Sequence, residues 1–321
     1  MNISAFSRSK YRNNKTSGDD AMLVIPGSIF ALFDGATDPF AHIENIGESS
    51  GRFASHTVAA ICAELFSDAR MKESSAESIL RIISSRFASA ASSQDFILGP
   101  STTLAITIFL EQDVRIISIG DTGVRVNGSD IYCYHKPIDS VTTTARVAIY
   151  HCLKDRYQDP DLLEDHTRQL SFLGLERGRK DQLIKDADVE EVLRQVFTQH
   201  SLLAPHEDIE RLILQGIVSQ KTYANRGEHP LGFSTLNGSE PLMDDVIDTV
   251  ISLDSLKTLE IFTDGYLTLP QGTAIKDWEE EYFHVEQVDF AKVSTFKNVK
   301  GSTSREFFDD RSIISLEMPT G

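Results

Sequence analysis

The sequence predicts an α+β protein in which most neighbouring strands run antiparallel. Short apolar runs are joined by tight turns, as at Pro26-Gly27 between residues 21–25 and 29–33. A second hairpin surrounds Asn127-Gly128. Apolar residues at helical spacing are confined to a few longer stretches, so strand–helix–strand crossovers are few. Together these patterns indicate antiparallel sheets with helices packed beside them.

The expected elements follow the chain in order. Residues 47–70 carry apolar side chains at helical spacing, and Ser74 with Glu77 predicts a capping box for a second helix that ends near residue 91. A meander of strands follows, at 101–110, 114–119, 124–126 and 131–134. Near the C-terminus we expect a strand at 259–263, a helix at 277–288 and a last strand at 313–316.

Residues 145–220 differ from the rest of the chain in their hydrophobic pattern. Apolar residues recur at helical spacing and are interrupted at 174–178. We expect a helical insertion or lid, 145–220, within a single domain that spans 1–321. The basic run at 177–180 predicts a solvated turn, with contact to an acidic phosphopeptide as the alternative.

The charge and cysteine content exclude several classes of protein. The net charge of −17 argues against a nucleic-acid binder, because phosphate contacts require a surplus of Lys and Arg. The three cysteines are not in CxxC spacing, which indicates a reducing compartment and no zinc knuckle. We see no signal peptide and no apolar run as long as a membrane span. We therefore expect a soluble cytoplasmic protein that binds neither nucleic acid nor membrane.

Carboxylates stand where apolar runs end. The run Ala31-Leu32-Phe33 leads into Asp34-Gly35, and Ile261-Phe262-Thr263 leads into Asp264-Gly265. Asp121 and the pair Asp309-Asp310 lie at similar strand edges. A single Asp-Gly is most simply a turn, but its recurrence favours strands that deliver ligands to one site.

The first hairpin brings more carboxylates to the same place. Asp19 and Asp20 begin one strand, and Asp34 ends its antiparallel neighbour, so these positions should lie side by side. Like charges this close are unfavourable without cations between them. A site made of carboxylates, without His or Cys, suits Mg²⁺ or Mn²⁺ rather than zinc.

The order of these motifs resembles the type 2C, metal-dependent protein serine/threonine phosphatases, especially their bacterial branch. The residues that carry the resemblance are Asp19-Asp20, Asp34-Gly35, Ser101-Thr102-Thr103, Gly120-Asp121-Thr122, His135-Lys136-Pro137, Asp264-Gly265 and Asp309-Asp310-Arg311-Ser312. They cover residues 19–137 and 252–318. The resemblance implies a four-layer sandwich: two mostly antiparallel sheets face to face, with helices outside.

The resemblance also implies a mechanism. Two Mg²⁺ or Mn²⁺ ions would activate a water that attacks a phosphoserine or phosphothreonine ester of a phosphoprotein, without a phosphoenzyme. We expect Asp34 to bridge the ions. The other expected metal-site residues are the Gly35 carbonyl, Asp264 and Asp309 as ligands, Asp20 through water with Asp19 as its alternate, and Asp121 for a third ion.

Two departures from the family pattern concern the substrate and the proton. Ala36 stands where the family usually has a histidine that serves as general acid. His42 and a metal-bound water are the candidates to replace it, and we favour the water. For the phosphate-binding arginine of the family, this chain offers Arg12 and Lys15, at altered spacing.

Two other functions remain open from the sequence. The missing histidine favours a catalytically weak, regulatory phosphatase-like binding module, whereas the retained carboxylates oppose it. A small-molecule phosphohydrolase would use the helical insertion as the lid of its pocket. The sequence specifies no oligomeric state.

Overall fold

The computed structural model describes residues 1–40 and 48–319, and these residues form two compact units. The first unit combines Met1–His135, Ser234–Phe283 and Asp309–Gly321. The second combines Lys136–Phe233 and His284–Phe308. The helical region expected at 145–220 therefore belongs to a unit that begins earlier and includes a later stretch of chain.

The first unit contains two five-stranded sheets whose paired strands are all antiparallel. One sheet has the order β1 (Asn2–Arg8), β10 (Arg311–Glu317), β9 (Thr258–Phe262), β6 (Gly123–Val126) and β7 (Asp130–Tyr132). The other has the order β2 (Ala21–Ile25), β3 (Ile29–Phe33), β4 (Leu104–Phe109), β5 (Asp113–Ile119) and β8 (Ile247–Ser252).

The two sheets share one apolar core. Phe30 and Leu32 of β3 pack in the same cluster as Ile261 of β9 and Ile314 of β10. Strand β3 can supply this core and a second one because all five of its residues are buried and successive side chains alternate between the faces. Its remaining residues, such as Ala31, pack under the helices on the other face.

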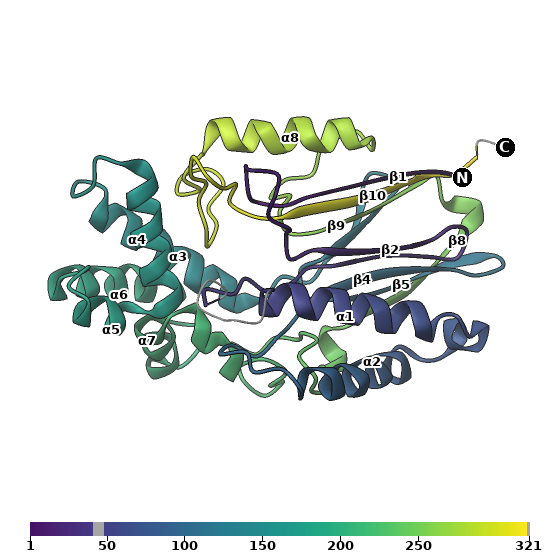
Figure 1. Ribbon diagram of the computed structural model, residues 1–321, viewed down its shortest axis with the longest axis horizontal. Helices are drawn as coiled ribbons and strands as arrows, with labels where there is room; N and C mark the ends of the chain where they lie inside the picture. Colours follow the sequence, from purple (N-terminus) through teal and green to yellow (C-terminus); the bar gives the residue numbers. More distant parts are fainter. Residues whose placement is uncertain (41–47, 320–321) are drawn as a thin grey trace. The chain divides into compact units, whose positions relative to one another are not determined.

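Helices cover the outer faces of both sheets (Figure 1). α1 (Ser50–Leu65) and α2 (Ala76–Ala91) pack on the β2–β5 sheet. On the other sheet lies α8 (Ile275–Val288), whose Trp278 contacts the ring of Phe262 with centroids 5.2 Å apart. The expected four-layer arrangement of two mostly antiparallel sheets between helices is confirmed.

The second unit is helical and has a core of its own. Its helices are α3 (Pro137–Leu153), α4 (Pro160–Leu173), α5 (Leu175–Lys180), α6 (Asp186–His200) and α7 (His206–Gln215). Short 3₁₀ helices are η2 (Ile217–Thr222) in this unit, and η1 (Ala69–Glu73), η3 (Met243–Asp245) and η4 (Leu253–Ser255) in the first.

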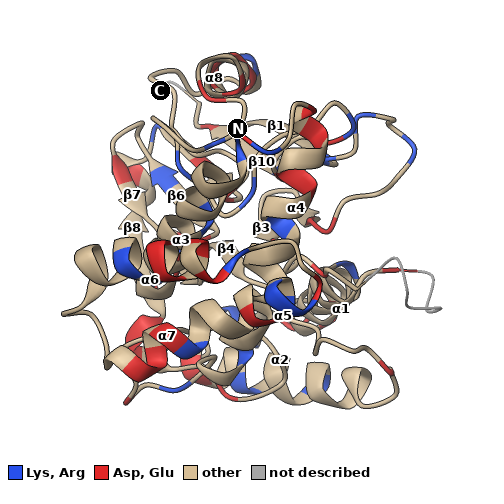
Figure 2. Cartoon of the chain, turned by 90° about the vertical axis from the view of Figure 1, so that its left-hand side faces the viewer, with Lys and Arg blue, Asp and Glu red and all other residues tan. Residues whose placement is uncertain are grey.

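Charges of both signs are interspersed on these helices (Figure 2). The basic run at 177–180 is part of α5 rather than a turn. Arg177 and Arg179 pair with Asp181 and Asp186, at 2.8 and 3.0 Å. These two arginines are thus largely compensated by their own neighbours.

The sequence patterns do not predict strands β1 and β8. Neither shows a continuous apolar run, because each lies at the edge of its sheet and keeps polar residues exposed. Asp248 of β8 forms an ion pair with Arg115 of β5, whose Nε donates to it at 2.7 Å. Among the described residues, no helix is both long and apolar enough to span a membrane.

Candidate functional site

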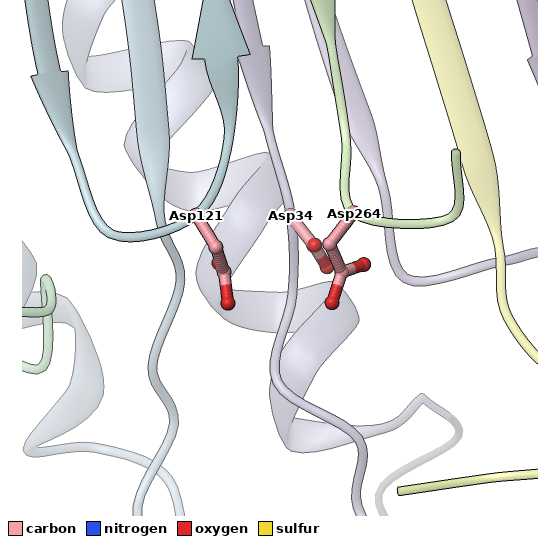
Figure 3. Close-up of side chains that lie close together, drawn as sticks. All are labelled: Asp34, Asp121 and Asp264. Atoms are coloured by element: carbon pink, nitrogen blue, oxygen red, sulfur yellow. The ribbon is translucent and has the colours of Figure 1, made fainter. Parts of the chain in front are cut away.

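Three carboxylates converge where strands of both sheets end. Asp34 follows β3 directly, and Asp121 and Asp264 lie two residues beyond β5 and β9. One carboxylate oxygen from each lies within 4.8 Å of the others, and the side chains extend the same way from their loops (Figure 3). The sequence predicted ligands at these strand ends, and the structure brings Asp121 into the same group as Asp34 and Asp264.

The loops that carry these residues are held by local contacts. Gly120 adopts a left-handed conformation (φ +77°), which glycine tolerates without strain. The hydroxyl groups of Thr122 and Thr103 lie 2.5 Å apart and fix the Asp121 loop. On the other side, the backbone at Asp34 is tied down by Thr103, whose N–H donates to the Asp34 carbonyl at 2.9 Å.

Both burial and neighbouring negative charges act on Asp34 in this group. Burial raises the pKa of Asp34 well above its usual value, and the negative charges of Asp264, Asp20, Asp121 and Asp309 raise it further. Burial and repulsion thus act in the same direction. A bound cation would reverse both effects by favouring the charged carboxylates.

Asp20 has one oxygen held and one oxygen unsatisfied. Its Oδ2 accepts hydrogen bonds from Thr263 Oγ1 at 3.0 Å and Ser312 Oγ at 2.7 Å. Its buried Oδ1 has no hydrogen-bond partner among the described residues. Burial and the charge of Asp310 raise the pKa of this carboxyl as well. A buried unpaired oxygen is unfavourable, and a cation or a water bound to one would satisfy it.

Asp19 and Asp310 have a different partner from the carboxylates above. Lys10 Nζ lies 3.2 Å from Asp19 and 3.6 Å from Asp310. Burial disfavours the charge of Lys10, but the two carboxylates outweigh it and raise the pKa of the ammonium above its usual value. Asp19 also accepts from Ser49 Oγ at 2.5 Å. Of the adjacent pair, Asp20 is therefore the residue whose carboxylate remains available.

Asp309 lies close enough to influence the group. Its charge contributes to the raised pKa of both Asp34 and Asp20, and its Oδ1 accepts the N–H of Asp310 at 3.0 Å. Glycine at position 265 lets the Asp310 carbonyl lie against the loop after β9, because a Cβ there would overlap that oxygen. Asp309 is thus near the three converging carboxylates without being one of them.

Gly35 is required by close packing rather than by its backbone angle. A Cβ at this position would lie 2.7 Å from the Asp19 carbonyl oxygen and would overlap the carbonyl of Gly51. The residue after Asp34 therefore has to be glycine for α1 to begin where it does. The three converging carboxylates, Asp34, Asp121 and Asp264, offer only oxygen atoms, which suit hard divalent cations such as Mg²⁺ or Mn²⁺.

The residues expected to bind phosphate lie on the loop after β1. Lys15 lines a cavity of about 340 Å³, whereas Arg12 is not among its described lining residues. Arg52 and His56 of α1 line the same cavity. The sequence placed Arg52 on a helix, but nothing in the helical pattern indicated which way its side chain points.

The two positions considered for proton transfer differ in what the structure shows. Ala36 is exposed, and its N–H donates to the Ser101 carbonyl at 3.0 Å. His42 lies outside the described residues. Lys10, Thr263 and Ser312, which hold the acidic residues in place, were not predicted because their contacts join distant parts of the chain.

No family model matches this chain, and neither does any curated protein. Solved structures resemble it at low identity. Serine/threonine phosphatase Stp1 from Staphylococcus aureus is 13% identical with a TM-score of 0.45, over 99% of this chain and 95% of that one. The Mycobacterium tuberculosis serine/threonine phosphatase PstP/Ppp is 13% identical with a TM-score of 0.47, over 99% of both chains.

A third solved structure is the catalytic domain of PstP in complex with two manganese ions. It is 13% identical with a TM-score of 0.43, over 98% of this chain and 97% of that one. These structural neighbours are bacterial serine/threonine phosphatases. At these identities the likeness concerns the fold alone.

Proposed function

We propose that this protein is a metal-dependent phosphatase that hydrolyses phosphoserine or phosphothreonine esters of phosphoproteins. The observation that carries the proposal is the convergence of Asp34, Asp121 and Asp264 at strand ends, beside the unsatisfied oxygen of Asp20. Two divalent cations would supply an activated water and neutralise charge on the phosphoryl oxygens.

The carboxylates divide into holders of the cations and holders of the structure. Asp34, between the other carboxylates, is the residue we expect to contact both ions, together with the Gly35 carbonyl. Asp264 and Asp309 would complete the metal environment, with Asp20 acting through water and Asp121 available to a further ion. We assign no metal to Asp19 and Asp310, because both carboxylates pair with the Lys10 ammonium.

The remaining steps concern the substrate. Arg12 and Lys15 are proposed to contact the substrate, Arg12 at its reacting phosphate. Ala36 cannot donate a proton, so we expect water to protonate the serine or threonine alkoxide as it leaves. Aryl phosphates, whose leaving groups depart without a proton, should therefore be favoured substrates.

We also propose that the whole chain acts as one phosphatase, with 145–220 as a helical insertion or lid. The order of the segments supports this, because the first unit is assembled from stretches before and after residues 136–233. One observation favours a second function, a weakly active regulatory module: the residue at the usual histidine position is alanine.

The test is release of phosphate from a phosphothreonine peptide with Mn²⁺ and with EDTA. We expect turnover by the wild type only with the metal, and a loss of at least a hundredfold in Asp264→Asn. Asp248→Asn is the matched control, because Asp248 pairs with Arg115 and is not part of the acidic group. Turnover that survives EDTA, or equal turnover in both variants, would contradict the proposal. Manganese binding without turnover would favour the regulatory module.

A further inference from the structure

We propose that the cavity beside α1 is a subsite for an acidic side chain that flanks the phosphorylated residue of the substrate, and that Arg52 and Lys15 recognise it. The inference rests on the proposed function and names the class of peptide preferred. The residues concerned all belong to the first unit.

The cavity of about 340 Å³ lies between the loop after β1 and the first turns of α1, and it is rich in cations. Its lining residues include Arg8, Lys15, Arg52 and His56 on the basic side, and Asp20 and Asp310 on the acidic side. Three of these lining residues, Arg8, Lys15 and Arg52, are positively charged in a chain whose net charge is −17. Such a cavity attracts anions by its local field rather than by the charge of the whole protein.

Arg52 is positioned by the backbone and keeps donors for a ligand. Its Nη1 donates to the Gly18 carbonyl at 2.7 Å, and its side chain has no carboxylate partner among the described residues. A guanidinium carries five N–H donors in a planar fork, which matches the two oxygens of a carboxylate or a phosphate. The Arg52 side chain therefore lines the cavity in a fixed position, and most of its N–H donors remain available to a ligand.

Lys15 lines the same cavity from the loop after β1. Asn13 orders this loop, since its Oδ1 accepts the N–H groups of Lys15 at 2.9 Å and Thr16 at 3.1 Å. The Lys15 side chain is exposed and pairs with no acid in the described part of the chain. Its ammonium can thus follow an anion into the cavity.

The acidic residues of the wall do not cancel these cations. Asp310 shares the Lys10 ammonium with Asp19, and its oxygens also accept the backbone N–H groups of Lys10 and Asp19 at 2.6 and 2.9 Å. Asp20 belongs to the acidic group proposed to face the metal ions. His56 adds a polar group rather than a charge at neutral pH, because burial and the adjacent Arg52 lower its pKa.

The position of the cavity indicates a second anion rather than the reacting phosphate. Asp34, Asp121 and Asp264 are absent from its described lining, but Asp20 belongs both to this lining and to the acidic group around them. An anion held by Arg52 would therefore lie next to the reacting phosphate and not at it. In a phosphopeptide, that neighbour is the side chain of a flanking residue, either a carboxylate or a second phosphate.

The test compares phosphothreonine peptides that differ at one flanking position, which carries Ala, Glu or phosphoserine. We expect the wild type to prefer the two anionic peptides over the Ala peptide by about tenfold in kcat/KM, a factor equivalent to ~1.4 kcal/mol. Which of the two is preferred distinguishes a carboxylate from a phosphate ligand. Arg52→Gln and Lys15→Ala should bring the ratio toward one. Arg86→Ala, at an exposed arginine that pairs with Glu64, should keep it.

Binding without turnover separates this inference from the proposed function. A fluorescent peptide with unphosphorylated threonine and a flanking Glu is titrated into the protein in EDTA. Weaker binding by Arg52→Gln than by Arg86→Ala supports the subsite even if no phosphopeptide is hydrolysed. Equal kcat/KM for the three peptides, or an unchanged preference in both Arg52→Gln and Lys15→Ala, overturns it. Lys15 lies on an exposed loop, so that variant reports on the subsite even if Arg52→Gln misfolds.

Discussion

Replacing Asp34 with asparagine should stabilise the metal-free protein while it destroys the site. The Asp34 carboxylate faces Asp121 and Asp264 in a group whose oxygens lie within 4.8 Å of one another. Asparagine has nearly the same shape and no charge, so the variant removes repulsion without opening a cavity. A residue kept for packing alone would behave in the opposite way.

The size of the effect follows from the geometry. Two unit charges 4.8 Å apart repel by ~3 kcal/mol at an effective dielectric constant of about 20 and by ~1 kcal/mol in bulk water. Partial protonation relieves part of this repulsion in the wild type, because the pKa of Asp34 is raised. We therefore expect a gain of about 1–3 kcal/mol, or roughly 2–4 °C in Tm for each kcal/mol.

The assay is thermal unfolding at neutral pH, in EDTA and in millimolar Mn²⁺. In EDTA, Asp34→Asn should melt above the wild type. In Mn²⁺ the order should reverse, because each of the two proposed ions, at about a hundred times its Kd, stabilises the folded state by ~2.7 kcal/mol. The asparagine variant should gain much less from the metal.

Asp310→Asn is the matched control for this reversal. Asp310 accepts the backbone N–H groups of Lys10 and Asp19, at 2.6 and 2.9 Å, and lies beside the Lys10 ammonium. Loss of its charge should lower stability in both conditions. If Asp34→Asn lowers stability in EDTA as much as Asp310→Asn does, then Asp34 is a satisfied structural carboxylate and the predicted repulsion is absent.

Three further predictions follow from particular contacts. Gly35→Ala should lower the free energy of unfolding in denaturant by about 1–3 kcal/mol, because the new Cβ would overlap the Gly51 carbonyl. Gly99→Ala is the control, since its Cβ would have nothing within 4 Å, and it should unfold like the wild type. Equal stability of the two variants would contradict the packing argument. Lys10→Met should lower the free energy of unfolding by about 3–5 kcal/mol in the same experiment, because Asp19 and Asp310 lose their shared cation. An unchanged unfolding midpoint would show that these two ion pairs do not stabilise the fold. Ala36→His should raise the ratio of kcat on a phosphothreonine peptide to kcat on nitrophenyl phosphate by about 10²-fold or more. If that ratio stays the same, and His42→Ala loses turnover of the peptide, then His42 is the general acid and water is not.

The parts of the site that were predictable are local in sequence. An apolar strand that runs straight into Asp-Gly identifies Asp34 and Asp264 within a few residues, and the first hairpin, which pairs Ala21 with Phe33, places Asp20 beside Asp34. The two-sheet architecture follows from the same hairpins, because antiparallel strands need only short turns.

The parts that were not predictable depend on contacts between distant segments. Lys10 is 300 residues from Asp310 in sequence, and no pattern around either residue indicates that they pair. The direction of Arg52 depends on how α1 is rotated against the loop after β1. Edge strand β1 lacks an apolar alternation and is defined by its pairing with β10, which begins more than 300 residues later.

A crystal structure with Mn²⁺, using anomalous scattering to locate the ions, shows whether the converging carboxylates bind divalent cations. We expect two anomalous peaks in contact with Asp34, at coordination distances of about 2.0–2.2 Å, with Asp264 contacting at least one of them. Ordered crystals grown in millimolar Mn²⁺ that show no peak at Asp34 would contradict this expectation.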